Sequence, residues 1–270
     1  TALGDADKVN YTTATGKTRF TKLAAGEGEI LSRNTTWTFS RDVDLSQTFV
    51  GVSYYDGQGF MVPKALGVKS AKGLDGASVC IQTGTTTELN LAEFFAGNGM
   101  TYNPVPIETN AEAQELYKAG RCDVYTTDAS GLYATKMSFD NPDAQAVLRE
   151  IVSKEPLGPV VRHGDDQWAD IVSWVLRAMM SAEEKGITSK NVKKLAAQDN
   201  KDKEINRLLG KDPLQGLSKL GLSADWAVNV ISQVGNYAES FERNLYPLTI
   251  VRGMNALYKD GGLHYIPPIK

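Results

Sequence analysis

Three threonines, Thr85, Thr86 and Thr87, follow Gly84 in the stretch CIQTGTTTELN at residues 80–90. A helix that begins directly after a strand and a glycine directs its first amide groups at the crevice beyond the strand's carboxyl end, where they attract an anion. The glycine lets a ligand approach the backbone, and the three hydroxyls can add hydrogen bonds to a carboxylate. The alternative is that Thr85 only caps the helix.

A second polar cluster, SRNTTWTFSRD at residues 32–42, follows a short apolar run and supplies Asn34, Thr36 and Arg41. An arginine at a strand end can bind a carboxylate through two parallel hydrogen bonds, which a lysine cannot do. The alternative for Arg41 is an ordinary ion pair on the surface or within the structure.

A third cluster, CDVYTTDASGLY at residues 122–133, ends its predicted strand on Asp128. This carboxylate can accept hydrogen bonds from an ammonium group, or it can cap the helix that follows. Taken together, an arginine, a hydroxyl-rich helix start and an aspartate at three strand ends predict a site for the carboxylate and ammonium groups of an amino acid.

The composition limits the class of ligand. The chain has 270 residues, of which 41% are hydrophobic, and can bury one large core or two modest ones. Its 29 basic and 32 acidic residues leave a formal charge of −3, which gives no electrostatic reason to expect nucleic acid or an anionic membrane as partner. A small neutral or zwitterionic ligand fits better. No stretch approaches the ~18 uninterrupted apolar residues of a membrane-spanning helix, and no leader sequence opens the chain.

The residue types of common enzyme and metal sites are sparse. His163 and His264 are the two histidines, neither lies in a nucleophile–base pattern, and HExxH, GxSxG and GxxxxGKS are missing from the sequence. Cys80 and Cys122 are too few and too far apart for a zinc site, which leaves a disulfide or two buried thiols. We therefore expect no catalytic residue, no metal and no cofactor, and we expect the tail around His264 to pack on the surface.

Short β-type runs alternate with helical patterns, which favours α/β units with mostly parallel sheets. The predicted strands cover residues 8–13, 28–34, 57–63, 77–82, 100–107, 122–127 and 158–163. The predicted helices cover residues 16–25, 85–98, 110–119, 129–136, 165–185, 189–197, 202–209, 223–242 and 249–259. Thr85 with Glu88, and Thr109 with Glu112, form Thr-x-x-Glu capping boxes. Residues 186–222 are rich in polar and turn residues and are expected to form a solvated elaboration without a core of its own.

Longer stretches resemble a known family. They are LSRNTTWTFSRD, YYDGQGFMVPK, GASVCIQTGTTTELNLAEFF, AGRCDVYTTDASGLYA, SKEPLGPVVRHGDDQW and FERNLYPLTIVRGMNALYKDGGLHYIPPI. These stretches, which span essentially the whole chain, resemble the general L-amino-acid-binding proteins of polar amino-acid ABC transporters, in periplasmic solute-binding protein family 3. The resemblance implies an α/β, two-lobed periplasmic-binding-protein fold of type II. It also implies a periplasmic protein that binds free L-amino acids between the lobes and delivers them to an ABC permease.

The resemblance further implies where the lobes divide. The two hinge crossings fall near residues 62–64 and 153–157, so that lobe 1 comprises residues 1–62 and 156–270, with a C-terminal helical extension, and lobe 2 comprises residues 63–155. Cys80 and Cys122 then lie on neighbouring strands of lobe 2. A disulfide between them closes a loop of roughly 40 residues, which stabilises the fold by about 4 kcal/mol on chain-entropy grounds.

The resemblance also assigns roles to the polar clusters. Arg41 matches the arginine that binds the α-carboxylate, with help from Thr36, and Asp128 matches the aspartate that binds the α-ammonium group. The further expected ligand contacts are Asn34, Thr85, Thr86, Thr87 and Arg19. Among these, Arg19 matches a position that reaches the ligand side chain in relatives with acidic ligands.

The chain departs from the family pattern at its start, because family members begin with a strand, a glycine-rich turn and a helix that precede the first residues here. We expect the first lobe to be truncated at its N-terminus, which exposes strand edges and apolar surface. Three explanations are open: a rearranged lobe with lost or altered ligand binding, a gap filled by another chain through dimerisation or domain swapping, or a fragment of a longer protein. A self-associating, sensory or interaction protein is therefore the alternative to a transport receptor, and a dehydratase-like enzyme is a third reading.

Overall fold

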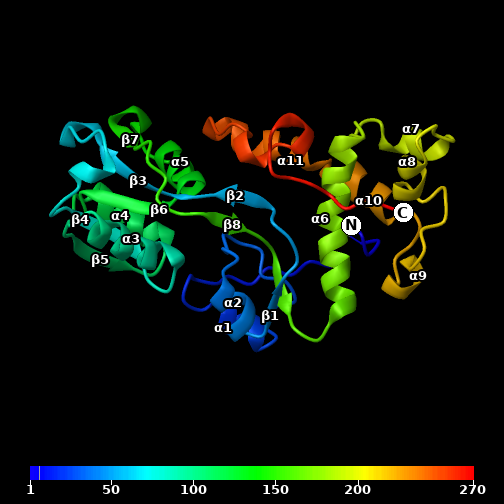
Figure 1. Cartoon of the computed structure of the whole chain (residues 1–270), viewed down its shortest axis with the longest axis horizontal. Coiled ribbons are helices and arrows are strands. Elements are labelled where there is room, and N and C mark those ends of the chain that lie inside the picture. Colours follow the sequence, from blue (N-terminus) through cyan, green and yellow to red (C-terminus); the bar gives the residue numbers. More distant parts are fainter. Residues whose placement is uncertain (6) are drawn as a thin grey trace. The chain divides into compact units, whose positions relative to one another are not determined.

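The computed structural model of the chain describes residues 1–5 and 7–270. These residues fold into two compact units (Figure 1). The helical unit comprises Thr1–Tyr11, Thr48–Ser53 and Val161–Lys270, and the sheet unit comprises Thr12–Gln47 and Tyr54–Val160. The lobe boundaries near residues 62 and 156, which follow from the two expected crossings, stay a prediction.

The sheet unit is built around five strands in the order β5-β4-β6-β3-β7. Their bounds are β3 (Gln58–Pro63), β4 (Ser78–Gln82), β5 (Asn103–Ile107), β6 (Val124–Asp128) and β7 (Gln145–Val147). β4 runs parallel to β5 and β6, whereas β3 runs antiparallel to β6 and β7. The sheet is therefore mixed and not mostly parallel, because β3 enters it against the direction of the strand–helix repeats that follow.

Apolar side chains bury both faces of this sheet. The helices of the unit are α1 (Arg19–Ala24), α2 (Phe39–Asp44), α3 (Thr86–Gly97), α4 (Asn110–Lys118) and α5 (Ala129–Met137). Successive residues of a strand point to opposite faces, so Phe60 and Val62 of β3 join one buried cluster and Met61 joins the other. Leu91 of α3 packs in the first cluster and Leu132 of α5 in the second. The sheet is a rigid base for the loops at its edge.

The two threonine caps form, but not as complete capping boxes. Thr85 Oγ1 accepts from the Glu88 amide at 3.3 Å, and the Glu88 carboxylate accepts from the amide of Gly84 at 3.0 Å, one residue before the cap. Thr109 and Glu112 repeat this arrangement at the start of α4. The glutamate thus closes a slightly larger ring than the expected one, and it satisfies an amide outside the helix.

The predicted disulfide is confirmed. Cys80 on β4 is bonded to Cys122, 42 residues further along the chain, with the two Cα atoms 5.5 Å apart. β4 and β6 are parallel neighbours in the sheet, and Cys80 pairs with Tyr125 in their register. The bond links two central strands below the edge where polar side chains gather.

Four short strands complete the β structure: β1 (Gln47–Phe49), β2 (Tyr54–Asp56), β8 (Glu155–Leu157) and β9 (Val160–Arg162). β2 pairs with β8 and β1 with β9. The strand predicted at residues 8–13 is wrong, since this segment is exposed and irregular. The strand predicted at 28–34 is reduced to an isolated bridge between Leu31 and Val160. Both segments contain β-prone residues, but a strand forms only where another strand pairs along its length.

The helical unit packs its helices around one core. They are α6 (Asp166–Glu184), α7 (Val192–Ala197), α8 (Lys203–Leu208), α9 (Leu217–Leu220), α10 (Trp226–Val234) and α11 (Tyr237–Leu245). The expectation that residues 186–222 are a solvated elaboration is wrong, because Ile187, Val192 and Leu208 are buried in the same cluster as Ile171 of α6. Their many polar neighbours masked a small set of well-spaced apolar residues.

Two helix predictions near the C-terminus need correction. The helix predicted at 223–242 is broken between α10 and α11, because Gly235 has a φ of 92° and Asn236 starts a complete capping box with Glu239. The helix predicted at 249–259 consists only of two 3-10 turns, Gly253–Asn255 and Tyr258–Asp260.

The tail around His264 was expected at the surface, but the histidine is buried. Its Nε2 lies 3.1 Å from the Tyr237 hydroxyl. Burial lowers the pKa of His264 to about 4, and the charge of Arg252 adds to this effect. His264 is therefore a neutral core residue.

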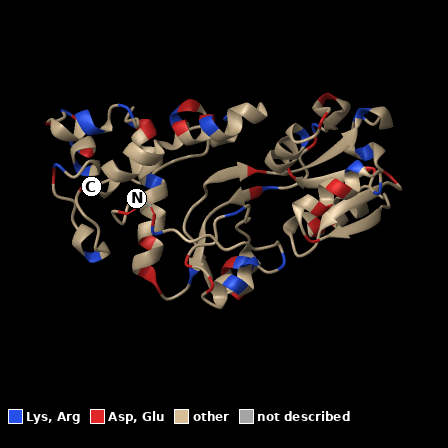
Figure 2. Cartoon of the chain, turned by 180° about the vertical axis from the view of Figure 1, so that it is seen from behind, with Lys and Arg blue, Asp and Glu red and all other residues tan. Residues whose placement is uncertain are grey.

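Charged residues of both signs are interspersed over the helices and loops of both units (Figure 2). This mixed distribution matches the near balance of basic and acidic residues. Among the described helices, none is long and apolar enough to cross a membrane.

Candidate functional site

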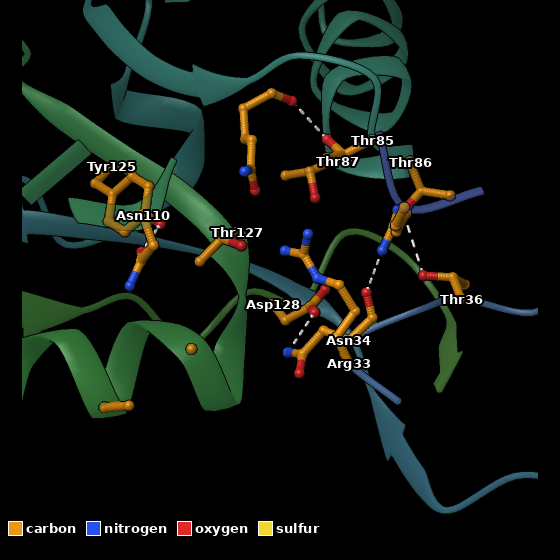
Figure 3. A pocket seen from close by; sticks show the side chains of 14 residues that line it. Arg33, Asn34, Thr36, Thr85, Thr86, Thr87, Asn110, Tyr125, Thr127 and Asp128 are labelled. Atoms are coloured by element: carbon orange, nitrogen blue, oxygen red, sulfur yellow. Dashed lines mark hydrogen bonds between the residues drawn. The ribbon is translucent and has the colours of Figure 1, made fainter. Parts of the chain in front are cut away.

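A pocket with a cavity volume of about 280 Å³ opens in the sheet unit (Figure 3). The residues that line it are Arg19, Arg33, Asn34, Thr36, Gln82, Thr85, Thr86, Thr87, Asn110, Tyr125, Thr127, Asp128, Gly131 and Ala134. Its volume is close to the lower end of the roughly 300–1,000 Å³ of small-molecule sites. The space suits one small ligand.

The topology of the sheet explains why these residues meet. β4 and β6 run parallel, so their carboxyl ends lie at one edge, where β4 leads to α3 and β6 leads to α5. The third contribution comes from residues 33–36, which lie between α1 and α2. All three polar clusters singled out in the sequence therefore supply lining residues.

The threonines at the start of α3 serve as caps and as pocket lining at the same time. Thr85 accepts from the Glu88 amide and donates to the Gln82 carbonyl at 2.7 Å. Thr86 is the first residue of α3, and Thr87 is buried beside it. The two readings of Thr85, cap or ligand contact, are thus compatible.

Asp128 is directed at the pocket and does not cap α5. It occupies the N-cap position, but its side chain makes no capping hydrogen bond. Only 7% of the residue is exposed, and its Oδ2 accepts from Asn34 Nδ2 at 2.8 Å. Burial raises the pKa of Asp128 to about 7, the charge of Asp56 adds to the rise, and the Asn34 hydrogen bond acts against it. This carboxylate is therefore short of a positive partner.

Arginines are the counterpart of this unpaired carboxylate. Within the described residues, none of the side chains of Arg19, Arg33 and Arg41 lies within 4.0 Å of a carboxylate oxygen. Burial is the main cause that lowers the pKa of all three guanidinium groups. Figure 3 shows Arg33 extending into the space between the start of α3 and the end of β6. The pocket is thus lined by charges of both signs that do not pair with each other.

Arg19 is the most buried of the three, with 3% of its surface exposed. Its Nη1 donates to the Asn34 carbonyl and to the Thr35 hydroxyl, and its guanidinium lies 4.9 Å from the Phe20 ring. Its Nε has no hydrogen-bond partner among the described residues. Burial lowers the pKa of Arg19 to about 9, and the charges of Arg41 and Arg33 add to this effect.

Arg41, the residue expected to bind the carboxylate, does not belong to the pocket lining. Its Nη1 donates to the Thr36 carbonyl at 3.0 Å, and its guanidinium lies 5.1 Å from the other side of the cluster formed with Phe20. The other predicted contacts, which all line the pocket, are Asn34, Thr36, Thr85, Thr86, Thr87, Asp128 and Arg19.

Several lining residues were missed from the sequence. Arg33 directly precedes Asn34 in the same motif, and Tyr125 and Thr127 alternate along β6 toward Asp128. Strand alternation places residues 125 and 127 on one face, so this signal was available once β6 was recognised. Gln82 and Asn110 follow strands β4 and β5 and carry the same kind of signal, a polar side chain at a strand end.

Comparison with known proteins settles the family. The chain is 55% identical over 271 aligned residues to the general L-amino acid-binding periplasmic protein of Rhizobium johnstonii, covering 99% of this chain and 79% of that protein. It is also 55% identical to a glutamate/glutamine/aspartate/asparagine-binding protein of Rhodobacter capsulatus, covering 99% and 80%. The chain belongs to the periplasmic amino-acid-binding proteins of ABC transporters. None of the models of known protein families that were compared matches this receptor.

A solved structure supports the same conclusion for the fold of this binding protein. A periplasmic binding protein of an ABC transporter from Brucella ovis, with glutathione bound, superposes with a TM-score of 0.94 at 50% identity, covering 99% of this chain and 84% of that one. The type II periplasmic-binding-protein fold is thereby confirmed. The relatives are binding proteins of transporters. In the part of the chain that the structure describes, no three His, Cys, Asp or Glu residues are grouped to hold a metal ion.

Proposed function

We propose that this chain binds a free L-amino acid in the pocket of the sheet unit and delivers it to an ABC permease. The observation that carries the proposal is the pair of unmatched charges: a buried Asp128 carboxylate and buried arginines that line one cavity without pairing. Leaving buried charges unpaired costs free energy, which a ligand with both an ammonium and a carboxylate group can recover.

The individual roles belong to the same proposal. Asp128 binds the ammonium group, and Arg41 binds the carboxylate together with Thr36 and the amides at the start of α3. Arg41 is printed with a single side-chain hydrogen bond, so most of its five N–H donors are open to a carboxylate. The remaining contacts in the proposed site are Asn34, Thr85, Thr86, Thr87 and, toward the ligand side chain, Arg19. The division into lobes at 1–62 with 156–270 and at 63–155 supports closure around the ligand and is proposed with it.

A panel of the twenty amino acids tests the proposal by thermal shift and calorimetry. A receptor with a micromolar dissociation constant is stabilised by about 4 kcal/mol at a thousandfold excess of ligand over that constant. Asp128→Asn removes the partner of the ammonium group and lowers affinity by about 2–5 kcal/mol. The matched control, Asp123→Asn, changes a carboxylate that accepts from Ser78 away from the pocket, and it leaves affinity unchanged. Absence of a shift with every amino acid contradicts the proposal.

Turnover separates a receptor from an enzyme with the same fold. A receptor returns its ligand unchanged, so NMR spectra of the best-binding amino acid stay constant during prolonged incubation with the protein. New resonances that depend on the protein would support an enzyme.

Self-association also stays a prediction. Sedimentation at several protein concentrations tests the homodimer or the domain-swapped oligomer expected from the resemblance. A strictly monomeric species at all concentrations contradicts it.

A further inference from the structure

Glu155, the first residue of β8, is a buried carboxylate held entirely by neutral donors. Only 1% of the residue is exposed. Its Oε2 accepts from the hydroxyls of Thr36 and Thr86, and its Oε1 accepts from Asn90 Nδ2 and Ser153 Oγ, each at 2.7 Å. Within the described residues, no Lys, Arg or His nitrogen lies within 4.0 Å of this carboxylate.

Two of the four donors are pocket residues. Thr36 and Thr86 both line the cavity, and they lie 119 and 69 residues away from Glu155 along the chain. Their hydroxyl oxygens are 3.3 Å apart, and Figure 3 shows the two side chains next to each other. Glu155 therefore ties together two lining residues from separate elements.

The hydrogen count of these hydroxyls determines what they can offer a ligand. A threonine hydroxyl has one hydrogen and two acceptor lone pairs. Because Thr36 and Thr86 both donate their hydrogen to Glu155 Oε2, each oxygen can only accept a hydrogen bond from the pocket side. A carboxylate oxygen placed there meets a lone pair, whereas an ammonium N–H meets an acceptor.

We propose that Glu155 is a positioning residue that sets the polarity of this part of the pocket: by taking the hydrogens of Thr36 and Thr86, it makes both hydroxyls acceptors for the ammonium group of the ligand. The inference rests on the proposed function and deepens it. Together with Asp128, the two threonines give the pocket three acceptors, which matches the three hydrogens of an ammonium group. The carboxylate of the ligand is left to the arginines and to the backbone amides of α3.

Glu155→Gln tests this role with little change in shape. The amide keeps one acceptor and gains a donor, and it places the donor toward the threonines because their hydroxyls can accept. The hydroxyl hydrogens then turn toward the pocket. The probes are the amino acid with the largest thermal shift in the panel and the acid that lacks only its ammonium group, which for L-glutamate is glutarate.

The expected result is a loss of about tenfold or more in affinity for the amino acid and no loss for the acid without the ammonium group. Glu93→Gln is the control, since it removes the same charge from an exposed position on α3 and leaves both affinities unchanged. A merely structural role of Glu155 would lower both affinities together.

A second pair of variants keeps the test valid if Glu155→Gln folds poorly. Thr36→Val and Thr86→Val remove the acceptors themselves, and each should reduce the preference for the amino acid over the acid without the ammonium group. In the background of both valines, Glu155→Gln should have no further effect on this preference.

The outcomes separate the two proposals. An unchanged preference in Glu155→Gln and in both valine variants, with normal binding by the unsubstituted chain, overturns the role of Glu155 and leaves the proposed function standing. Failure of the unsubstituted chain to bind any amino acid overturns the proposed function, and the role of Glu155 with it.

Discussion

Buried charges are treated differently in the two units. In the helical unit, Arg252 forms an ion pair with Glu183 at 2.7 Å and donates to the Asn255 carbonyl at 3.0 Å. In the sheet unit, Asp128 and Arg19 are more deeply buried, yet neither has an ionic partner among the described residues. A charge that has a partner in the fold stabilises the fold, and a charge without one is available to a ligand.

The largest expected effect is the pH dependence that Asp128 gives to the ligand-free protein. Its pKa is raised to about 7 from an ordinary value of 3.8, so the folded state binds more protons than the unfolded state between these values. The stabilisation is complete below about pH 4 and is lost as the pH rises through about 7, by up to about 4 kcal/mol. Urea unfolding should therefore show Asp128→Asn gaining stability relative to the unsubstituted chain as the pH rises.

Asp123→Asn is the control for this measurement. Hydrogen bonds from Ser78 lower the pKa of Asp123, so its contribution to stability is present at neutral pH and is lost on acidification. The relative stability of this variant should change with pH in the opposite direction. Equal pH profiles for the two variants would contradict the unpaired state of Asp128.

The second largest effect concerns the paired charge in the helical unit. Arg252→Met leaves the Glu183 carboxylate without its partner and should lower the free energy of unfolding by about 3 kcal/mol, as measured by urea unfolding. Amino-acid affinity should not change. Lys259→Met removes a charge from an exposed neighbouring position and should alter stability by less than about 0.5 kcal/mol. A ligand-affinity defect in Arg252→Met would break the comparison.

The smallest effect compares two helix caps within the sheet unit. Thr85 and Thr109 make the same capping bond at the starts of α3 and α4, but only Thr85 lines the pocket. Thr85→Ala and Thr109→Ala should each lower the unfolding free energy by about 1 kcal/mol. Calorimetry should show weaker amino-acid binding for Thr85→Ala alone, and equal binding by both variants would make Thr85 a cap and nothing more.

Local patterns carried much of the fold. The strands around Phe60, Cys80 and Asp128 and the helices that follow them were recognised because strand propensity, glycine and a capping threonine act within a few residues of each other. The segments that failed depend on distant partners. Residues 8–13 have strand-like composition but no pairing strand, and Ile187 and Val192 lie in a polar stretch but reach a core built by other helices.

The candidate site divides in the same way. The three polar clusters were visible as polar residues at strand ends, and seven of the eight expected contacts line one pocket. The lack of an ionic partner for Asp128 and the position of Arg41 behind the Thr36 carbonyl were not visible. Both depend on which side chains meet after folding, and spacing along the chain does not contain that information.

The sequence by itself determined the strand–helix units, the helix caps and the family, because these follow from neighbouring residues and from long shared motifs. Only the tertiary structure decided how the polar groups are shared. Glu155 takes the hydroxyl hydrogens of Thr36 and Thr86 from far along the chain, and each hydroxyl has a single hydrogen to give. A hydrogen used within the protein is not available to a ligand, so the polarity of the pocket was decided when these distant segments came together.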